Sequence, residues 1–162
     1  MNTGKRFEQQ IKDSVPGNVY YYRLRDGTGA WSKNDGNVRF QQSNVCDCLL
    51  FAQTRLFMLE LKSCKGKSFP FSKIRNDQLS GLIDAQKYDG ITAGIVINFN
   101  EHGRTFYIDI DVLERKIALG SKKSINLSEL ELLGTEIPGT RKRVNYKWNL
   151  SVLWKGGVQS ET

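Results

Sequence analysis

The residues best suited to chemistry in this chain are two carboxylates and a lysine: Asp47, Glu60 and Lys62. They fall in two apolar, β-prone runs, 45–52 and 56–63, and this pattern predicts a β-hairpin. Carboxylate oxygens are the hard ligands that Mg²⁺ prefers, and a nearby ammonium can orient water or neutralise charge that develops on a phosphate. Three such groups on one hairpin therefore suit metal-dependent hydrolysis of a phosphodiester.

The turn of this hairpin predicts which residues face each other. If Gln53 and Thr54 form its centre, Asp47 lies directly opposite Glu60 and Lys62 lies on the same face. Two carboxylates with Cβ atoms about 4.5–5.5 Å apart repel, so a divalent cation between them is the simplest expectation. An exposed strand end with a Glu–Lys pair of little energetic value gives the same pattern. The opposite, core-facing side is predicted to hold Cys46, Cys48, Leu59 and Leu61.

Cysteine and histidine chemistry is not expected. Cys46, Cys48 and Cys64 lack the CxxC spacing of zinc sites, and three cysteines cannot form a paired disulfide framework. His102 is the only histidine, and it lies in the turn-like run 100–103. We interpret it as a surface turn residue, which leaves no general base for a Ser-His-Asp or Cys-His site.

The charge of the chain favours a polyanionic partner. Lys and Arg total 24 against 17 Asp and Glu, which gives a net charge of +7 and a pI near 9.4. Interleaved aromatic residues, without an obvious basic amphipathic helix, favour nucleic acid over a membrane, although an inert basic surface is an alternative. No apolar run approaches the roughly 18 residues of a membrane span, and no signal peptide is evident, so a cytoplasmic location is expected.

The elements that must position these residues predict one α/β domain, 1–162, with a mixed sheet between helices. Thr3 and Ser72 are the predicted caps of the first two helices. In chain order we expect a helix over 3–14, a strand over 19–24, an extended excursion over 25–43, the hairpin, a helix over 74–88, strands over 92–99 and 104–110, and helices over 111–119 and 128–134.

Asp47, followed thirteen residues later by Glu60-Leu61-Lys62, resembles the signature of the PD-(D/E)xK nuclease superfamily. The flanking sequence is similar to the RecU-type Holliday junction resolvases of Gram-positive bacteria and their phages. The stretch 124–150 resembles that family's run from a short helix through Glu-Ile-Pro to an Arg and a Tyr. Two further family motifs are matched by Gly4, Phe7 and Glu8 on the first helix and by Phe69, Pro70 and Gln78 before and on the second.

This resemblance implies a restriction-endonuclease-like fold and a homodimer that cuts four-way DNA junctions with Mg²⁺, for which Mn²⁺ can substitute. Carried over residue by residue, the metal ligands are Asp47, Glu60 and Gln78. The catalytic lysine is Lys62, and Glu8 is the acid carried by the first helix. The catalytic set is thus Lys62, Glu8, Asp47 and Glu60.

The chain departs from the family pattern in two places. Val45 stands where the family usually has a hydroxyl residue, so water, a backbone carbonyl or Ser43 is expected to replace that ligand. The segment 25–43 corresponds to the family's stalk and is shorter, which bears on junction selectivity more than on hydrolysis.

Ten basic residues are candidates for DNA contacts, although solvated surface residues would look the same. They are Arg23, Arg25, Lys33, Arg39, Lys65, Lys67, Lys73, Arg75, Arg141 and Arg143. Trp31 and Phe40 are candidate wedges for a branch point, with core packing as the alternative. The remaining alternatives for the whole chain are another PD-(D/E)xK nuclease, of the restriction or repair type, and a branched-DNA-binding protein without catalysis.

Overall fold

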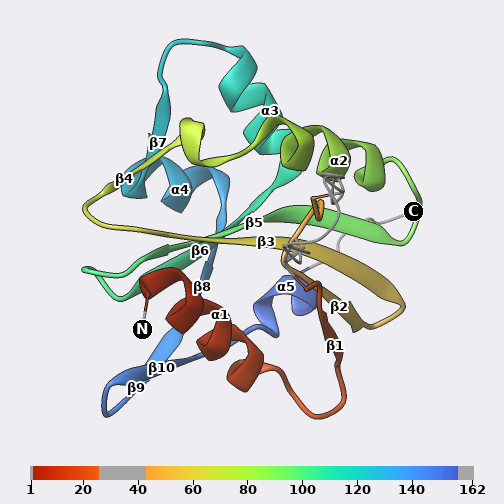
Figure 1. Ribbon diagram of the computed structural model, residues 1–162, viewed down its shortest axis with the longest axis vertical. Coiled ribbons are helices and arrows are strands. Elements are labelled where there is room, and N and C mark those ends of the chain that lie inside the picture. The colour runs from red at the N-terminus through yellow and green to blue at the C-terminus, as the bar shows by residue number, and fades with distance from the viewer. Residues whose placement is uncertain (1, 26–42, 157–162) are drawn as a thin grey trace, which may run out of the picture.

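The computed structural model describes residues 2–25 and 43–156. Most of the predicted excursion falls outside this part of the chain. The predictions for Trp31, Lys33, Arg39 and Phe40 therefore lie outside the described residues. Figure 1 shows a sheet that crosses the middle of the molecule with helices on both of its faces, which confirms the predicted α/β architecture.

The central sheet has six strands in the order β1-β2-β3-β5-β6-β8. Only the β3–β5 pair is parallel, because α2 provides the crossover between these two strands. The strands are β1 (Tyr20–Arg23), β2 (Cys48–Ala52), β3 (Arg55–Cys64), β5 (Ile91–Phe99), β6 (Arg104–Asp109) and β8 (Thr135–Ile137). Two small sheets pair β4 (Ser68–Pro70) with β7 (Ser124–Asn126) and β9 (Gly139–Lys142) with β10 (Asn145–Trp148).

The buried apolar residues form two cores, one on each face of the sheet, and helices cover both faces. The first, the α1-side core, contains Phe7, Leu59 and Trp148; the second, the α2-side core, contains Leu82 and Ile97. The helices are α1 (Thr3–Ser14), the 3₁₀ helix η1 (Phe71–Lys73), α2 (Asn76–Gln86), α3 (Ile110–Ala118), α4 (Leu127–Leu133) and α5 (Val152–Lys155). Among the described residues, no helix has the length and apolar character needed to cross a membrane.

Helix α1 has the predicted bounds, and it buries Phe7 and Ile11 against the sheet as its four-residue spacing indicates. The predicted cap is wrong by one residue. Asn2 caps the helix, because its side-chain oxygen accepts a hydrogen bond from Gly4 N at 3.1 Å while Thr3 is already helical.

The predicted hairpin of β2 and β3 is confirmed in its turn and in its register from Cys48 to Ala52. Gln53 and Thr54 have φ of 47° and 65°, the left-handed conformations that a two-residue hairpin turn requires. The pairs run from Ala52 with Arg55 to Cys48 with Leu59.

The predicted alternation fails just before β2 begins. Asp47 N donates to Leu59 O at 3.1 Å, although Leu59 is already the partner of Cys48, so the chain is offset by one residue at this point. Cys48 and Leu59 share the α1-side core with Leu61, as predicted, but Cys46 lies in the α2-side core. The offset is the physical reason that the predicted side for Cys46 is wrong.

Helix α2 is shorter than predicted, and Ser72 is not its cap. Ser72 belongs to η1, and the chain reaches helical geometry again only at Asn76. Arg75 occupies the N-cap position, where its N–H donates to the Gln78 side chain at 3.3 Å. The exposed turn position of His102 is confirmed.

The remaining predicted strands and helices correspond to β5, β6, α3 and α4 with small shifts at their ends. The sequence did not predict six short elements, which have only three or four residues each. Two of them, β4 and β7, pair with each other from distant parts of the chain. The six elements are β4, β7, β8, β9, β10 and α5.

Candidate active site

Glu60 is the centre of the candidate site. It lies in β3, between β2 and β5, and its side chain is 2% exposed. Oε1 accepts hydrogen bonds from Lys62 Nζ at 2.7 Å and from Gln78 Nε2 at 2.6 Å. Oε2 is also buried, yet it has no hydrogen-bond partner among residues 2–25 and 43–156. A buried carboxylate oxygen without a donor is costly, so this atom is suited to a cation that the protein itself does not provide.

Lys62 lies on the same face of β3 as Glu60, which confirms the predicted alternation. Its ammonium contacts Glu60, and 20% of the side chain is exposed to solvent. Lys62 Nζ also lies 3.4 Å from Gln78 Oε1. The lysine is therefore held in a defined position and is still accessible to a substrate.

Asp47 reaches the site from the position just before β2. Its Oδ2 accepts a hydrogen bond from Leu61 N, the residue after Glu60, at 2.7 Å, and its carbonyl accepts from Leu24 N at 2.9 Å. The ladder ends at Cys48, so the structure does not give Asp47 the regular pairing with Glu60 that we expected. The side-chain bond to Leu61 nevertheless fixes Asp47 beside the strand that carries Glu60.

Gln78 links the site to the first turn of α2. Its Nε2 donates to Glu60, while its Oε1 accepts from Lys62 and from Arg75 N. The side chain is buried and all these contacts come from one amide group, so it orients Glu60 and Lys62. Its predicted role as a metal ligand stays a prediction.

Glu8 lies on α1 and forms an ion pair with Arg23 of β1, with a 2.6 Å distance between Arg23 Nη2 and Glu8 Oε2. The pair is near Asp47, because Arg23 is paired with Cys48 across β1 and β2 and Leu24 N donates to the Asp47 carbonyl. Burial and then Cys48 raise the pKa of Tyr21 to about 12; Arg23 opposes this shift, and Glu8 and Asp47 add to it. The catalytic role of Glu8 and the DNA contact of Arg23 are not tested by this pairing.

The donor set fits a hard divalent cation held by few protein ligands. Within the described residues there is no cluster of three or more His, Cys, Asp or Glu side chains that would hold a metal. Asp47 and Glu60 supply two carboxylates, one with an unpartnered buried oxygen. Mg²⁺ is commonly bound through one or two carboxylates together with waters and substrate phosphates.

Ser43, the predicted substitute for the missing hydroxyl ligand, and Val45 both contact helix α2. The Ser43 hydroxyl donates to Asp77 at the start of α2, and Val45 lies against Gly81, where an added Cβ would be 2.7 Å from a Val45 methyl. Arg75 pairs with Asp77 at 3.3 Å. This cluster at the end of the segment 25–43 was missed by the sequence analysis, which carried no signal for it beyond the proximity of Arg75 and Asp77 in the chain.

The predicted DNA contacts that fall in the described residues are all exposed. Lys73 Nζ lies 3.5 Å from Ser63 O, and Arg75 Nη2 lies 3.2 Å from Asn44 O, so both extend along the surface near the end of β3. Arg25, Lys65 and Lys67 lie on loops, while Arg141 and Arg143 lie on the hairpin of β9 and β10. Lys33 and Arg39 lie outside the described residues.

A mixed sheet whose hairpin carries a carboxylate pair and a lysine defines the restriction-endonuclease-like class of folds. The structure is similar to that of Hjc, a Holliday junction resolvase from Archaeoglobus fulgidus, with a TM-score of 0.52 and 18% identity. The similarity covers 82% of this chain and 95% of the archaeal one, and it supports the shared fold.

The chain belongs to the RecU family, described as Recombination protein U, whose family model matches residues 29–151. It is 30% identical to the SPbeta prophage-derived uncharacterized protein YotM of Bacillus subtilis, over 94% of this chain and 85% of that protein. It is 28% identical to the Holliday junction resolvase RecU of Mycoplasmopsis pulmonis, over 80% of this chain and 81% of the relative. The matched region includes Asp47, Glu60, Lys62 and Gln78 but begins after Glu8.

Proposed function

We propose that this RecU-family protein is an endodeoxyribonuclease that resolves four-way DNA junctions by paired nicks in recombination and repair, with Mg²⁺ as its cofactor. The observation that carries the proposal is the buried, unpartnered Oε2 of Glu60, beside Lys62 and close to Asp47. Family membership supports the same activity, because the Mycoplasmopsis pulmonis relative is described as a Holliday junction resolvase.

Asp47 and Glu60 are the residues that would hold the metal. A bound Mg²⁺ supplies a Lewis acid that activates water and stabilises negative charge on the phosphate and the leaving oxygen. Mn²⁺ has similar ligand preferences and is expected to substitute. Gln78 is a further proposed ligand, provided that its amide oxygen turns towards the ion.

Lys62 assists the attack in this proposal. Its ammonium lies beside Glu60 on a partly exposed side chain, from which it would donate a hydrogen bond to the attacking water or to a phosphate oxygen as negative charge develops. Gln78 holds both groups from α2, which limits the freedom of the ammonium before substrate arrives. Glu8 is proposed to act as an additional acid once Arg23 engages DNA.

We also infer a homodimer of single-domain subunits that acts in the cytoplasm, where its DNA substrate would be met. Two symmetry-related sites can nick opposed strands of one junction, which a single site cannot do in one encounter. The exposed basic residues supply phosphate contacts along the arms.

The test is cleavage of a labelled four-way junction by the purified protein, with and without Mg²⁺, beside a linear duplex and a flap of the same sequence. Mg²⁺-dependent paired nicks in the junction, with little cutting of the other substrates, are expected. Equal cutting of all three substrates would assign the chain to a restriction or repair type of nuclease. Tight junction binding without nicks under any divalent cation would assign it to binding alone.

A further inference from the structure

The hairpin of β9 and β10 is strongly basic and has no acidic residue between Gly139 and Trp148. Its four cationic side chains are all exposed: Arg141, Lys142, Arg143 and Lys147. Within the described residues, none of the four pairs with a carboxylate, whereas Arg104 on the neighbouring β6 is bound by Glu131 and Glu136. The cations of the hairpin are therefore available to an anionic partner.

The base of this hairpin is rigidly attached to the α1-side core. Trp148 is 2% exposed; its N–H donates to the Ser14 hydroxyl at 2.8 Å and its indole to Gln10 at 3.2 Å. Tyr146 stacks on Trp148 with ring centroids 5.0 Å apart. Gly139 lies so close to the Trp148 ring that an added Cβ would be 2.4 Å from it.

The tip is fixed as well, although it projects from the body of the molecule (Figure 1). Arg6 of α1 donates to the Val144 carbonyl and, at 3.2 Å, to the Asn145 side chain. Arg143 turns the chain with φ of 53°. Val144 is consequently held at the tip with 70% of its surface exposed, an unusual position for an apolar side chain between polar neighbours.

A rigid two-stranded ribbon with unpaired cations and an apolar tip matches the major groove of duplex DNA. That groove is about 12 Å wide and admits a two-stranded β-ribbon, while the minor groove is about half as wide. The walls of the groove carry phosphates for the lysines and arginines, and thymine methyl groups on its floor suit an apolar side chain such as Val144.

We propose that the β9–β10 hairpin enters the major groove of a duplex arm, with its cations on the phosphates and Val144 against the base edges. The inference rests on the proposed function for its substrate. In Figure 1, α1 lies between this hairpin and β1, and Glu8 of α1 pairs with Arg23 of β1. Glu60 and Lys62 contact Gln78 of α2, whereas Trp148 anchors the hairpin in the α1-side core, so the hairpin would hold an arm on the α1 side of the sheet, away from these two side chains.

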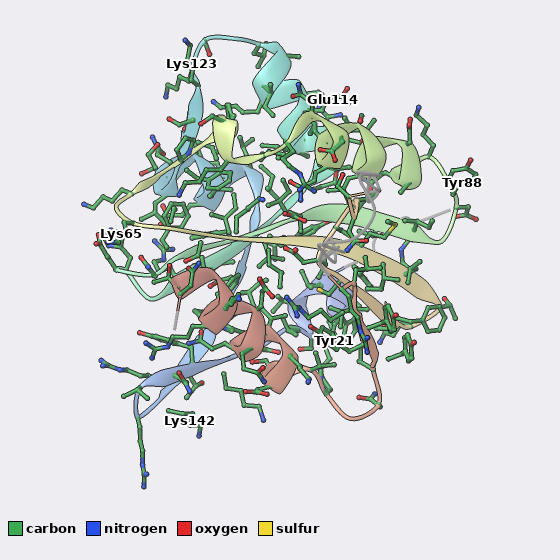
Figure 2. The ribbon with its side chains drawn as sticks, in the orientation of Figure 1. Tyr21, Lys65, Tyr88, Glu114, Lys123 and Lys142 are labelled. Carbon is green, nitrogen blue, oxygen red and sulfur yellow. The ribbon has the colours of Figure 1, made fainter. Side chains whose placement is uncertain are left out.

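The charge arm of the test compares two double variants that each remove two exposed lysines. Lys142→Ala with Lys147→Ala changes the hairpin, whereas Lys123→Ala with Lys155→Ala is the matched control. Figure 2 shows Lys142 and Lys123 at opposite ends of the molecule. Binding to a four-way junction and to a linear duplex is measured against salt concentration without a divalent cation, so that no DNA is cut.

The hairpin variant is expected to reduce the slope of log K against log salt by about 1.8, or about 0.9 for each lost phosphate contact, while the control leaves it close to that of the wild type. Equal slopes in the two variants would overturn the proposal. Among the described residues, neither lysine of the hairpin makes a side-chain hydrogen bond or ion pair, and both are exposed, so both double variants are expected to keep the fold. Circular dichroism of both proteins checks this.

The second part of the test, which addresses the groove, uses Val144→Ala and junctions whose duplex arms carry uracil in place of thymine. The wild type is expected to bind uracil arms about fourfold more weakly, the value of one buried methyl group, and Val144→Ala is expected to bind both arms equally. Netropsin, which fills the minor groove, should not displace the wild type. The assignment to the major groove would be refuted if netropsin displaced the wild type, or if the wild type bound thymine and uracil arms with equal affinity.

Failure of the hairpin proposal and failure of the proposed function give different results. A wild type that shows these binding effects but makes no nicks with Mg²⁺ or Mn²⁺ contradicts the nuclease and supports the hairpin. A wild type that makes paired nicks but shows equal slopes in both double variants contradicts the hairpin alone.

Discussion

Replacing Asp47 by Asn or by Ala separates the charge of this side chain from its hydrogen bond. In Asp47→Asn the amide oxygen can still accept from Leu61 N, which lies 2.7 Å from the native carboxylate. A charged acceptor is worth about 1 kcal/mol more than a neutral one, so the free energy of unfolding without metal should fall by about 1 kcal/mol or less. In Asp47→Ala the Leu61 N–H loses its partner, and the loss should be about 1–3 kcal/mol.

The response to Mg²⁺ should distinguish the wild type from both variants. At ten times the dissociation constant, binding to the folded state alone adds about 1.4 kcal/mol, or about 3–6 °C in Tm for a chain of this size. Asp47→Asn should lose this rise in Tm and also lose cleavage, while it keeps junction binding. The assays are urea unfolding without metal, thermal unfolding with increasing Mg²⁺, and cleavage of a labelled junction.

Two results would refute the reasoning about Asp47. Equal stability of Asp47→Asn and Asp47→Ala would mean that the bond to Leu61 contributes nothing. Near wild-type cleavage by Asp47→Asn in low millimolar Mg²⁺ would remove the carboxylate from the metal site.

Three further outcomes are expected. Lys62→Ala should lower the cleavage rate constant by several orders of magnitude with little change in DNA affinity. Lys67→Ala should instead lower the slope of log K against log salt by about 0.9. Identical behaviour of the two variants in both assays would contradict a catalytic role for Lys62 that is distinct from phosphate binding by Lys67. The pKa of Glu129 is lowered from 4.5 to about 2, foremost by its hydrogen bond with Lys116 and then by those from the Asn126 N–H and Lys122. The stabilisation from Glu129 is therefore present above about pH 4.5 and lost as pH falls towards 2, and the urea midpoint of Glu129→Gln should fall less over that range than that of the wild type. Gly103→Ala should cost about 1–2 kcal/mol in urea unfolding, because Gly103 has φ of 60°; an unchanged midpoint would contradict this.

The hairpin of β2 and β3 was predictable because its turn and its alternation depend on residues close together in the sequence. The turn residues and the period of two set the register from Cys48 to Ala52, and the same period places Glu60 and Lys62 on one face. Cys46 was assigned to the wrong core because the offset at Asp47 leaves no trace in the hydrophobic pattern.

The rest of the site depends on contacts between distant elements. Gln78 reaches Glu60 from α2, and residue types on a helix do not reveal which strand they touch. Its place near the site was predicted only through the family resemblance. The pairing of Glu8 with Arg23 was likewise not expected, since each residue had been assigned a separate role.

The β9–β10 hairpin escaped prediction for a different reason. Its turn contains Arg143 and Val144 in place of the Asn-Gly or Asp-Gly that usually marks a two-residue turn. Arg6 stabilises this turn from the other end of the chain, so the local sequence lacks the usual signal.

The attachment of α1 to β10 has a consequence for the order of folding. Ser14 and Gln10 bond to Trp148, and Arg6 bonds to Asn145, so sequence separations of 134 to 139 residues must close before α1 is fully held. Contacts of such long range form late, because closing a long loop costs entropy before the contact repays it. During synthesis, β2, β3, α2 and β5 can assemble around Asp47, Glu60 and Lys62 well before residue 148 leaves the ribosome. A partly made chain would therefore hold its carboxylates in place before the contacts of α1 with β10 form, and the hairpin that we propose to bind DNA would be completed after the carboxylate site.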